Sequence, residues 1–366
     1  MMANNIIRSV LVLLLLACQS LALAESTVGF KTYDFVDPQR ENWAGDGPRP
    51  LTTAVWYPAS SAADTIEIAF PRGQPIFIGG TVAAGAALET DGKKRPLVIM
   101  SHGTGGSGLQ MMWLGRRLAA AGYIAAAVNH HGNTAAEASY DPRGFRLFWE
   151  RTTDLSRVID LLLDHPEIGP GIDSSSIAAV GFSLGGYTVT ALAGGRIDLE
   201  QFEAYCAGPQ HDATCDAQNE YPQAETDFQR LMASDPRVSA ALQRHRDSFS
   251  DTRIAAVIAL APALGGAFTD ESLRAIDIPV LLMTGGGDDI APARGNGQRL
   301  GELIPDAVFE RLPDNVGHYA FLNPCTDHGK KYVPLCQDTG GLDRDQHHQK
   351  TANRVMAFLE QHLAHD

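Results

Sequence analysis

The chain is poor in positive charge. Its 366 residues include 29 lysines and arginines against 43 aspartates and glutamates, which gives a formal net charge of −14. Proteins that bind nucleic acid or adsorb to anionic lipid need basic surfaces, so this balance argues against both kinds of partner. No internal repeat or low-complexity tract is visible either. With 44% hydrophobic residues, the chain can bury a sizeable core as a single α/β domain.

The chain also lacks an apolar run long enough to cross a membrane as a mature helix. The apolar stretch 10–17 follows Arg8 and precedes the small-residue sequence Ala22-Leu23-Ala24. This order is typical of a cleaved signal peptide, so we expect residues 1–24 to be removed and the mature protein to be periplasmic or secreted. The alternative is a lipobox that ends at Cys18, which would anchor an outer-membrane lipoprotein. The cleavage site is the better match.

Cysteine is scarce, and no C-x-x-C pair occurs. Four cysteines follow the leader, and in an exported protein an even number indicates disulfides. Proximity in the sequence predicts the pairs Cys206–Cys215 and Cys325–Cys336, although four cysteines allow three pairings. A zinc site is the rival interpretation, and the spacings do not fit it.

Hydrophobic patterning predicts alternating strands and helices. Two strand-like runs, 28–35 and 51–57, are expected to form an antiparallel edge pair, and 58–94 is expected to be a long loop that can include a short hairpin. The later strands are expected at 96–101, 123–128, 176–180, 254–260, 279–283 and 307–312. Helices are expected at 109–121, 145–163, 187–193, 296–303 and 351–363.

This alternation predicts a mostly parallel central sheet with helices on both faces, which is the order of an α/β-hydrolase fold. We expect one domain over residues 25–366. The charged segment at about 196–253 breaks the alternation and holds one helix, 225–242, broken at Pro236. We interpret it as a cap-like insertion that forms one wall of the substrate pocket, with a surface excursion as the alternative.

The chain is organised around Gly181-Phe-Ser-Leu-Gly185. Strand, G-x-S-x-G and helix in this order are typical of a nucleophile elbow, in which glycines remove collisions around a sharp turn and the serine hydroxyl is exposed. We therefore predict Ser183 as a nucleophile. The alternative is a glycine-rich turn with an incidental serine.

A serine nucleophile needs a base and an orienting acid, which in this fold follow it in the order acid, then histidine. A glycine-rich loop after the strand 279–283 carries Asp288 and Asp289. The pattern G-x-x-D-x-x-x-P favours Asp288, and Asp289 is the alternative. The base is expected after the last strand, where Gly317 precedes His318.

The remaining histidines are assigned structural roles. His130 and His131 follow a strand and are expected to cap it, with pocket lining as the alternative, while His347 and His348 are expected to be solvated residues before the last helix. Neither pair has a carboxylate or cysteine at a metal-ligand spacing, so we predict no metal and no cofactor.

An oxyanion hole needs two backbone N–H groups. One is expected from Leu184, and the other from Thr104 in the loop 101–108, with Gly103 or Gly105 as alternatives. The same loop satisfies the G-x-G-x-x-G dinucleotide fingerprint. That interpretation is rejected because the next strand lacks the acidic residue that binds the ribose.

With these residues placed, the chain resembles bacterial secreted members of the dienelactone hydrolase-like group of α/β-hydrolases, related to platelet-activating-factor acetylhydrolase. The resemblance covers most of the mature chain and rests chiefly on Ser101-His-Gly-Thr-Gly-Gly106, Gly181-Phe-Ser-Leu-Gly-Gly186, Gly317-His-Tyr-Ala-Phe-Leu322 and Cys336-Gln-Asp-Thr-Gly-Gly-Leu-Asp-Arg344. It implies the same roles for the predicted triad and oxyanion donors. True dienelactone hydrolases use a cysteine nucleophile, so the group name does not imply the activity.

Together these features predict an exported serine hydrolase that cleaves a small-molecule or lipid-like carboxylic ester through an acyl-enzyme. Ser183 attacks, His318 is the base, Asp288 orients the imidazole, and Thr104 and Leu184 bind the oxyanion. An amidase or peptidase with the same triad is one alternative. A non-catalytic binding protein on the same fold is the other, because fold does not imply function.

Overall fold

A computed structural model describes residues 27–60, 63–338 and 340–363 of the chain. The expected signal peptide, residues 1–24, and the alternative lipid anchor at Cys18 lie outside the described residues. Within these ranges, none of the helices combines the length and the apolar character needed to cross a membrane.

Ten strands in the described residues form one sheet in the order β10-β9-β8-β7-β5-β6-β2-β1-β4-β3. The strands β5 to β10 run parallel to one another, whereas β2 pairs antiparallel with both β6 and β1. Their bounds are β1 (Thr27–Glu41), β2 (Pro48–Ala59), β3 (Ile66–Phe70), β4 (Phe77–Ala84), β5 (Arg95–Ser101), β6 (Ile124–Val128), β7 (Ile172–Phe182), β8 (Ile254–Leu260), β9 (Val280–Thr284) and β10 (Val308–Arg311).

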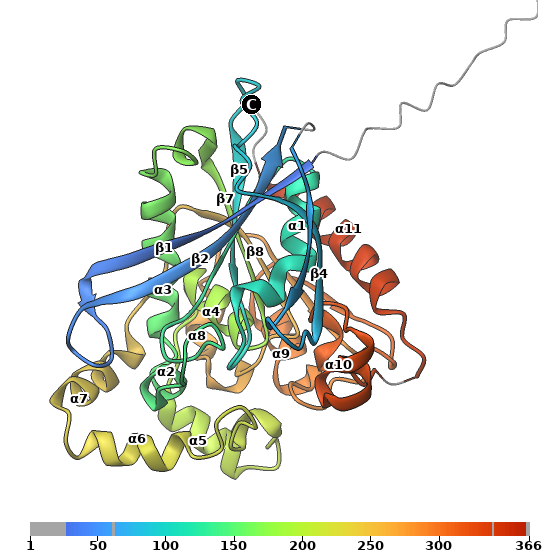
Figure 1. Cartoon of the computed structure of the whole chain (residues 1–366). Helices are drawn as coiled ribbons and strands as arrows, with labels where there is room; N and C mark the ends of the chain where they lie inside the picture. The colour runs from blue at the N-terminus through green and yellow to red at the C-terminus, as the bar shows by residue number, and fades with distance from the viewer. Residues whose placement is uncertain (1–26, 61–62, 339, 364–366) are drawn as a thin grey trace, which may run out of the picture.

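Helices cover both faces of this sheet (Figure 1). The prediction of a mostly parallel sheet between helical layers is therefore confirmed. The helices are α1 (Met112–Ala120), α2 (Pro142–Arg146), α3 (Glu150–Leu163), α4 (Leu184–Leu192), α5 (Leu199–Ala207), α6 (Ala224–Met232), α7 (Pro236–Gln243), α8 (Asp270–Arg274), α9 (Gly297–Leu303), α10 (Asp327–Tyr332) and α11 (Arg344–His362).

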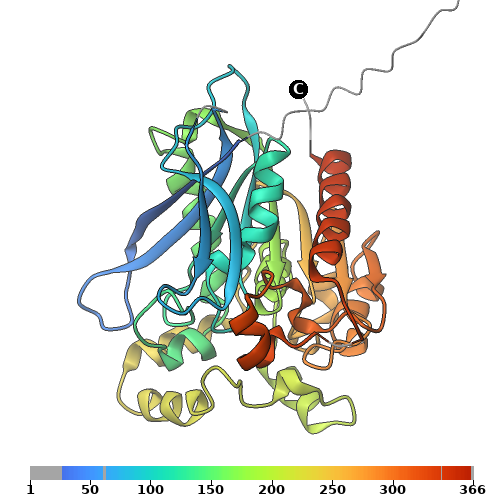
Figure 2. The ribbon, with the colours of Figure 1, turned by 45° about the vertical axis from the view of Figure 1, so that its right-hand side comes forward.

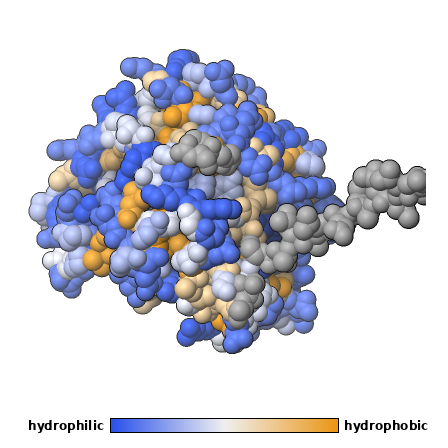
Figure 3. Space-filling view, turned by 90° about the horizontal axis from the view of Figure 1, so that it is seen from above, coloured by the Kyte–Doolittle hydropathy of each residue, from blue (hydrophilic) through white to orange (hydrophobic). Residues whose placement is uncertain are grey.

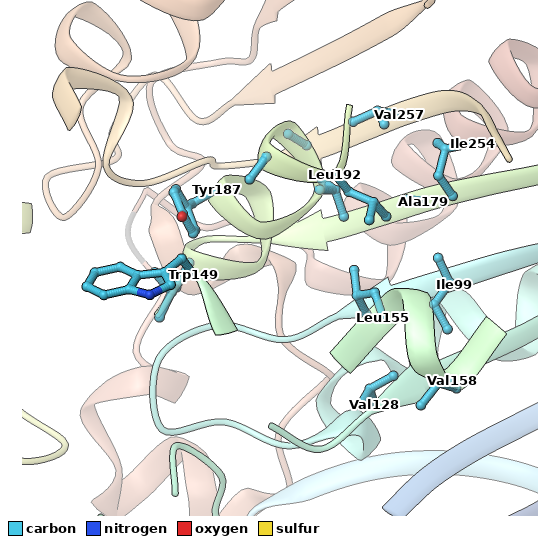
Figure 4. Close-up of a cluster of buried hydrophobic side chains, with 14 of the residues drawn as sticks. Ile99, Val128, Trp149, Leu155, Val158, Ala179, Tyr187, Leu192, Ile254 and Val257 are labelled. Atoms are coloured by element: carbon cyan, nitrogen blue, oxygen red, sulfur yellow. The ribbon is translucent and has the colours of Figure 1, made fainter. Parts of the chain in front are cut away.

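The hydrophobic core consists of two clusters, one on each face of the sheet. Alternate residues of β5 divide between them: Leu97 and Ile99 join α3 and α4, and Val98 and Met100 join α1 and α11. Figure 4 shows part of the first cluster. The division follows from strand geometry, because successive side chains point to opposite faces. The sequence of a strand that is buried on both faces is therefore an almost continuous run of apolar residues, as in β6 and β9.

The insertion carries α5, α6 and α7, and α6 ends before Pro236 begins α7. These helices lie across the end of the molecule where the central parallel strands finish (Figures 1 and 2). The opposite end, viewed in Figure 3, presents a largely hydrophilic surface with scattered hydrophobic residues. The insertion therefore lies where it can cover the loops that follow the carboxyl ends of the parallel strands.

The structure contains both disulfides in the predicted pairing. Cys206 at the end of α5 is joined to Cys215, and Cys325 is joined to Cys336, with Cα–Cα distances of 5.5 and 5.8 Å. The first disulfide closes a short loop at the start of the insertion, and the second closes the segment that contains α10.

Three expectations about the elements are wrong. The strands β1 and β2 form the expected antiparallel pair but not the edge of the sheet, because the hairpin of β3 and β4 within 58–94 extends the sheet beyond them through pairing of β4 with β1. The expected helix 145–163 is two helices, separated by residues 147–149. Asp141 caps the first of them by accepting a hydrogen bond from the Arg143 N–H, which starts α2 upstream of the expected helix.

The third correction concerns the last helix, which begins at Arg344 rather than at residue 351. His347 and His348 are therefore helical and buried instead of solvated. His348 stacks on Trp113 of α1, with ring centroids 4.1 Å apart, and its Nε2–H donates to the carbonyl of Ala320. Burial lowers the pKa of His347 to about 4, so this ring packs as a neutral group.

Candidate active site

Ser183 lies on the sharp turn between β7 and α4, with φ of 56° and ψ of −118°. A residue other than glycine rarely adopts a positive φ, so the backbone at Ser183 is strained and must be held by its surroundings. The Ser183 N–H donates to Leu260 O at 3.0 Å, and its carbonyl accepts from Ala263 N at 3.1 Å. Both partners lie at or just after the end of β8. The neighbouring strand thus supports the turn.

The flanking glycines are required by close backbone approach. A Cβ on Gly181 would collide with the carbonyl oxygen of Gly185, and a Cβ on Gly185 would collide with the carbonyl oxygen of Ser101 in β5. These collisions involve backbone atoms that cannot rotate away. These collisions explain why glycine is required two residues before and two residues after Ser183.

The structure brings Ser183, His318 and Asp288 together. His318 Nδ1 donates to Asp288 Oδ2 at 2.8 Å, and His318 Nε2 lies 2.9 Å from Ser183 Oγ. Because Asp288 holds the proton on Nδ1, Nε2 is free to accept the serine proton. The exposed fractions are 7% for Ser183, 4% for His318 and 6% for Asp288, so the relay is shielded from most solvent.

The geometry favours Asp288 over the alternative, Asp289. The second oxygen of Asp288 accepts hydrogen bonds from the N–H groups of Ile290 and Ala291 at 3.1 and 2.7 Å, which fix the carboxylate in the turn after β9. The side chain of Asp289 is exposed. Only the carboxylate of Asp288 reaches the imidazole of His318.

Two of the candidate oxyanion donors lie beside Ser183. Thr104 and Leu184 line the same cavity as the serine, and neither backbone N–H donates to another residue in the part of the chain that the structure describes. Leu184 begins α4, where helical N–H groups have no partner within the helix. The alternative donor Gly105 is already engaged, because its N–H donates to Asn133 Oδ1 at 2.7 Å.

A buried polar cluster holds the loop that carries Thr104. Arg151 of α3 donates from Nη2 to the carbonyl of His102, and the same nitrogen reaches Ser101 Oγ at 3.2 Å. His102 donates from Nδ1 to Gly103 O at 2.7 Å, and its Nε2 accepts from the backbone N–H of His130 at 3.2 Å. Each residue from 101 to 103 is thus fixed by a hydrogen bond.

His130 connects this loop to a second group of charges. Its Nδ1 lies 3.1 Å from Asp154 Oδ2, and Ser101 Oγ donates to its Nε2 at 2.9 Å, so the ring is neutral with the proton on Nδ1. Burial, reinforced by the charge of Arg151, lowers the pKa of His130 to about 3. The expectation that His130 caps a strand is therefore wrong, and the ring does not line the cavities at Ser183.

Asp154 is the anionic centre of the cluster. Arg49 of β2 contacts it at 2.8 and 3.0 Å, and Arg40 of β1 contacts it at 2.6 Å. Burial alone would raise its pKa, but the two guanidinium groups hold the pKa of Asp154 well below its usual range. Burial also lowers the pKa of Arg151 to about 9. Burial of the positive charge of Arg151 therefore lowers the stability of the folded protein.

Sequence reasoning missed Arg151 and Asp154. The available signal was their spacing, since charged residues three apart in an otherwise apolar helix face share one side. The spacing could not indicate that this side faces the loop after β5 rather than solvent. Across the described ranges, no group of three or more His, Cys, Asp or Glu side chains could hold a metal ion.

Two cavities meet at Ser183. One, of about 380 Å³, is lined by both polar and apolar residues and includes His318. The other, of about 120 Å³, is lined mainly by apolar groups and includes Leu184. Residues 216–218 of the insertion line both, so the insertion forms part of the wall over the serine.

Comparison with known proteins agrees with this architecture. The chain is similar in structure to a ferulic acid esterase from Streptomyces cinnamoneus, with a TM-score of 0.61 and 20% identity over 93% of this chain and 91% of that one. At this identity the similarity shows a shared fold. No curated protein sequence matches the chain. A model of the alpha/beta hydrolase family matches residues 98–327, which is more than half of its length, and the chain belongs to that family.

Proposed function

We propose that this protein is a serine hydrolase that cleaves carboxylic esters. The observation that carries the proposal is the relay from Asp288 through His318 to Ser183, formed at a cavity that Thr104 and Leu184 also line. The backbone N–H groups of these two residues have no partner among the described residues. This combination supplies a nucleophile, a base and an oxyanion site within reach of one carbonyl group. The esterase name of the structural neighbour supports an ester substrate.

The steps follow from the positions of the atoms. Ser183 Oγ attacks the ester carbonyl while His318 Nε2 takes its proton, and the negative oxygen is bound by the N–H groups of Thr104 and Leu184. Collapse of this intermediate breaks the carbon–oxygen bond, and His318 Nε2 returns the proton to the departing alcohol. Water then attacks the acyl-Ser183 ester through the same base. Asp288 stabilises the imidazolium in both halves.

We also propose that the protein is periplasmic or secreted and that it belongs to the dienelactone hydrolase-like group. Disulfides persist in oxidising compartments, so the bonds Cys206–Cys215 and Cys325–Cys336 support a periplasmic or secreted protein. The motifs around Ser183 and His318 support a place in the dienelactone hydrolase-like group, with serine as the nucleophile.

Labelling with a fluorophosphonate, followed by peptide mapping, tests the proposal. We expect the label on Ser183 in the wild type and none in Ser183→Ala, whereas Ser248→Ala, which removes an exposed serine, is expected to label normally. Turnover of p-nitrophenyl butyrate is expected to fall by about a thousandfold or more in Ser183→Ala and in His318→Ala.

Two results would contradict this assignment. One is near-normal ester turnover by folded Ser183→Ala, and the other is a folded wild type that neither labels nor hydrolyses esters, which would favour a binding protein. Faster cleavage of a matched butyryl anilide than of the ester would favour the amidase alternative.

A further inference from the structure

The insertion divides the space over Ser183. Residues 216–218 form a bridge that lines both the polar and the apolar cavity, and the disulfide at Cys215 secures the bridge at its start. We call these cavities the polar chamber and the apolar chamber. An ester has two substituents on opposite sides of its reacting carbonyl, so two chambers that meet at the nucleophile offer one site for each.

The apolar chamber is built mainly from aromatic and aliphatic side chains, with the ion pair of Arg146 and Glu225 also in its lining. Its lining combines α2 and the residues after it with the insertion and the loop after β8, through Phe145, Phe148, Phe202, Tyr221, Ala263 and Leu264. Its volume of about 120 Å³ is on the scale of the cavity of about 150 Å³ that accommodates benzene in another protein. It therefore suits a compact apolar group of about the size of one ring.

The polar chamber differs in composition. Besides apolar residues, its lining includes the amide side chains of Gln110, Gln218 and Asn219, the phenols of Tyr140 and Tyr319, and the carboxylates of Glu220 and Asp216. The carboxylate of Asp216 pairs with His211 at 3.2 Å. Among the described residues that line it there is no lysine or arginine. This chamber presents hydrogen-bonding groups without a positive charge, so it disfavours an alcohol that carries a phosphate or a carboxylate.

The catalytic chemistry assigns the two halves of the substrate to the two chambers. His318 must hand its proton to the leaving oxygen, so the departing alcohol has to lie next to His318. His318 lines the polar chamber but not the apolar one. The alcohol therefore occupies the polar chamber, and the acyl group extends past Leu184 into the apolar chamber.

Glu220 is the distinctive group of the polar chamber. It reaches from the insertion onto the oxyanion loop, where a Cβ on Gly105 would lie 2.7 Å from Glu220 Cγ. Within the described parts of the chain it forms no ion pair with lysine or arginine. Burial raises the pKa of Glu220, while a hydrogen bond from its own backbone N–H and, when His318 is protonated, the charge of that imidazole act in the opposite direction. A half-buried carboxylate with one backbone donor and no cationic partner can accept further hydrogen bonds from a ligand.

We propose that Glu220 selects esters of polyhydroxylated alcohols, by accepting hydrogen bonds from hydroxyl groups of the alcohol beside the leaving oxygen. The inference rests on the proposed ester hydrolysis at Ser183. A carboxylate with amide and phenol neighbours offers the acceptors and donors that vicinal hydroxyl groups need. A plain alkyl alcohol would displace water from these groups and leave them unsatisfied, which is the strongest form of discrimination available to a polar pocket.

Glyceryl monobutyrate and propyl butyrate provide the test, because they share the acyl group and the three-carbon alcohol and differ in two hydroxyl groups. Both produce the same butyryl-Ser183, so an effect of the alcohol appears in the acylation step and is measured as kcat/KM. The wild type is expected to favour the glyceryl ester by about 10- to 100-fold, the range of a hydrogen bond to a charged group.

Three variants isolate the carboxylate. Glu220→Leu is expected to abolish the preference for the glyceryl ester, and Glu220→Gln, which keeps an acceptor without the charge, to retain part of it. Glu203→Gln removes an exposed carboxylate of α5 that lines neither chamber, and it is expected to behave as wild type. Melting temperatures are expected to stay near wild type throughout, which shows that the insertion has folded.

Each remaining outcome overturns a defined part of the reasoning. An unchanged glyceryl-to-propyl ratio in Glu220→Leu would refute the role of Glu220. A wild-type preference for butyrylcholine over both other esters, lost in Glu220→Gln, would show a cation site in place of a hydroxyl site. Failure of the folded wild type to cleave any of the esters, p-nitrophenyl butyrate included, would refute the ester hydrolysis itself and this inference with it.

Discussion

Replacement of Arg151 by methionine separates the fold from the catalytic geometry. The guanidinium donates to the carbonyl of His102 and to Ser101 Oγ at the base of the loop that carries Thr104. Methionine fills a similar volume without a donor. We therefore expect Arg151→Met to release the oxyanion loop while it leaves the relay of Ser183 and His318 in place.

The effect on stability is the difference between two opposing contributions. Loss of the donor leaves buried acceptors unsatisfied, which costs about 1–3 kcal/mol for each. Burial, however, lowers the pKa of Arg151 to about 9, so the environment disfavours its charge by an amount on the order of a few kcal/mol, which the substitution recovers. The charges of Arg49 and Arg40 remain on Asp154. We expect the free energy of unfolding to change by no more than about 2 kcal/mol.

The catalytic activity of Arg151→Met is expected to change more than its stability. Complete loss of an oxyanion donor costs about a hundredfold to a thousandfold in kcat, so a displaced Thr104 should cost about 10- to 100-fold, with little change in KM. The assay pairs steady-state kinetics on p-nitrophenyl butyrate with urea unfolding. Arg157→Met is the control, because Arg157 lies on the same helix with a side chain 24% exposed and pairs with Asp37 and Asp160. Normal kcat in Arg151→Met, whatever its stability, would refute the positioning role.

Two further predictions concern the elbow and the buried histidine. Gly185→Ala is expected to destabilise the fold by about 3 kcal/mol or more through collision with Ser101 O, whereas Gly317→Ala, where a new Cβ has only a distant neighbour at 3.8 Å, should be near neutral; equal melting temperatures would contradict this. His130 has its pKa lowered to about 3, so below pH 6.5 the unfolded chain binds a proton that the folded protein excludes, and stability falls as the pH falls. Between pH 7.5 and 4.5 wild type should lose about 2–3 kcal/mol more than His130→Asn, and His211→Asn, an exposed control, should lose as much as wild type.

The sequence by itself predicted the parallel part of the sheet, the turn at Ser183 and the residues of the proposed triad. These features depend on short-range patterns: apolar runs between turns, glycines at fixed offsets from Ser183, and an acid and a histidine each placed in the loop after a strand. Parallel strands bring their carboxyl ends to one edge, so residues that follow separate strands meet there without further information. Asp288 could be preferred over Asp289 on pattern, but only the turn after β9 shows which carboxylate faces His318.

The tertiary structure alone decided what surrounds the triad. Arg151, His130 and Asp154 meet across elements far apart in the sequence, and no local pattern records that a histidine after β6 is buried against a helix. The same holds for β4, whose pairing with β1 was hidden by weak periodicity, and for the early start of α11 over Trp113. Glu220 lies in a charged insertion whose composition resembles solvated surface, and only the folded chain places its side chain against Gly105 in the loop after β5. Burial and partner choice depend on the whole fold, and for that reason the candidate site residues could be predicted from the sequence while the groups that surround them could not.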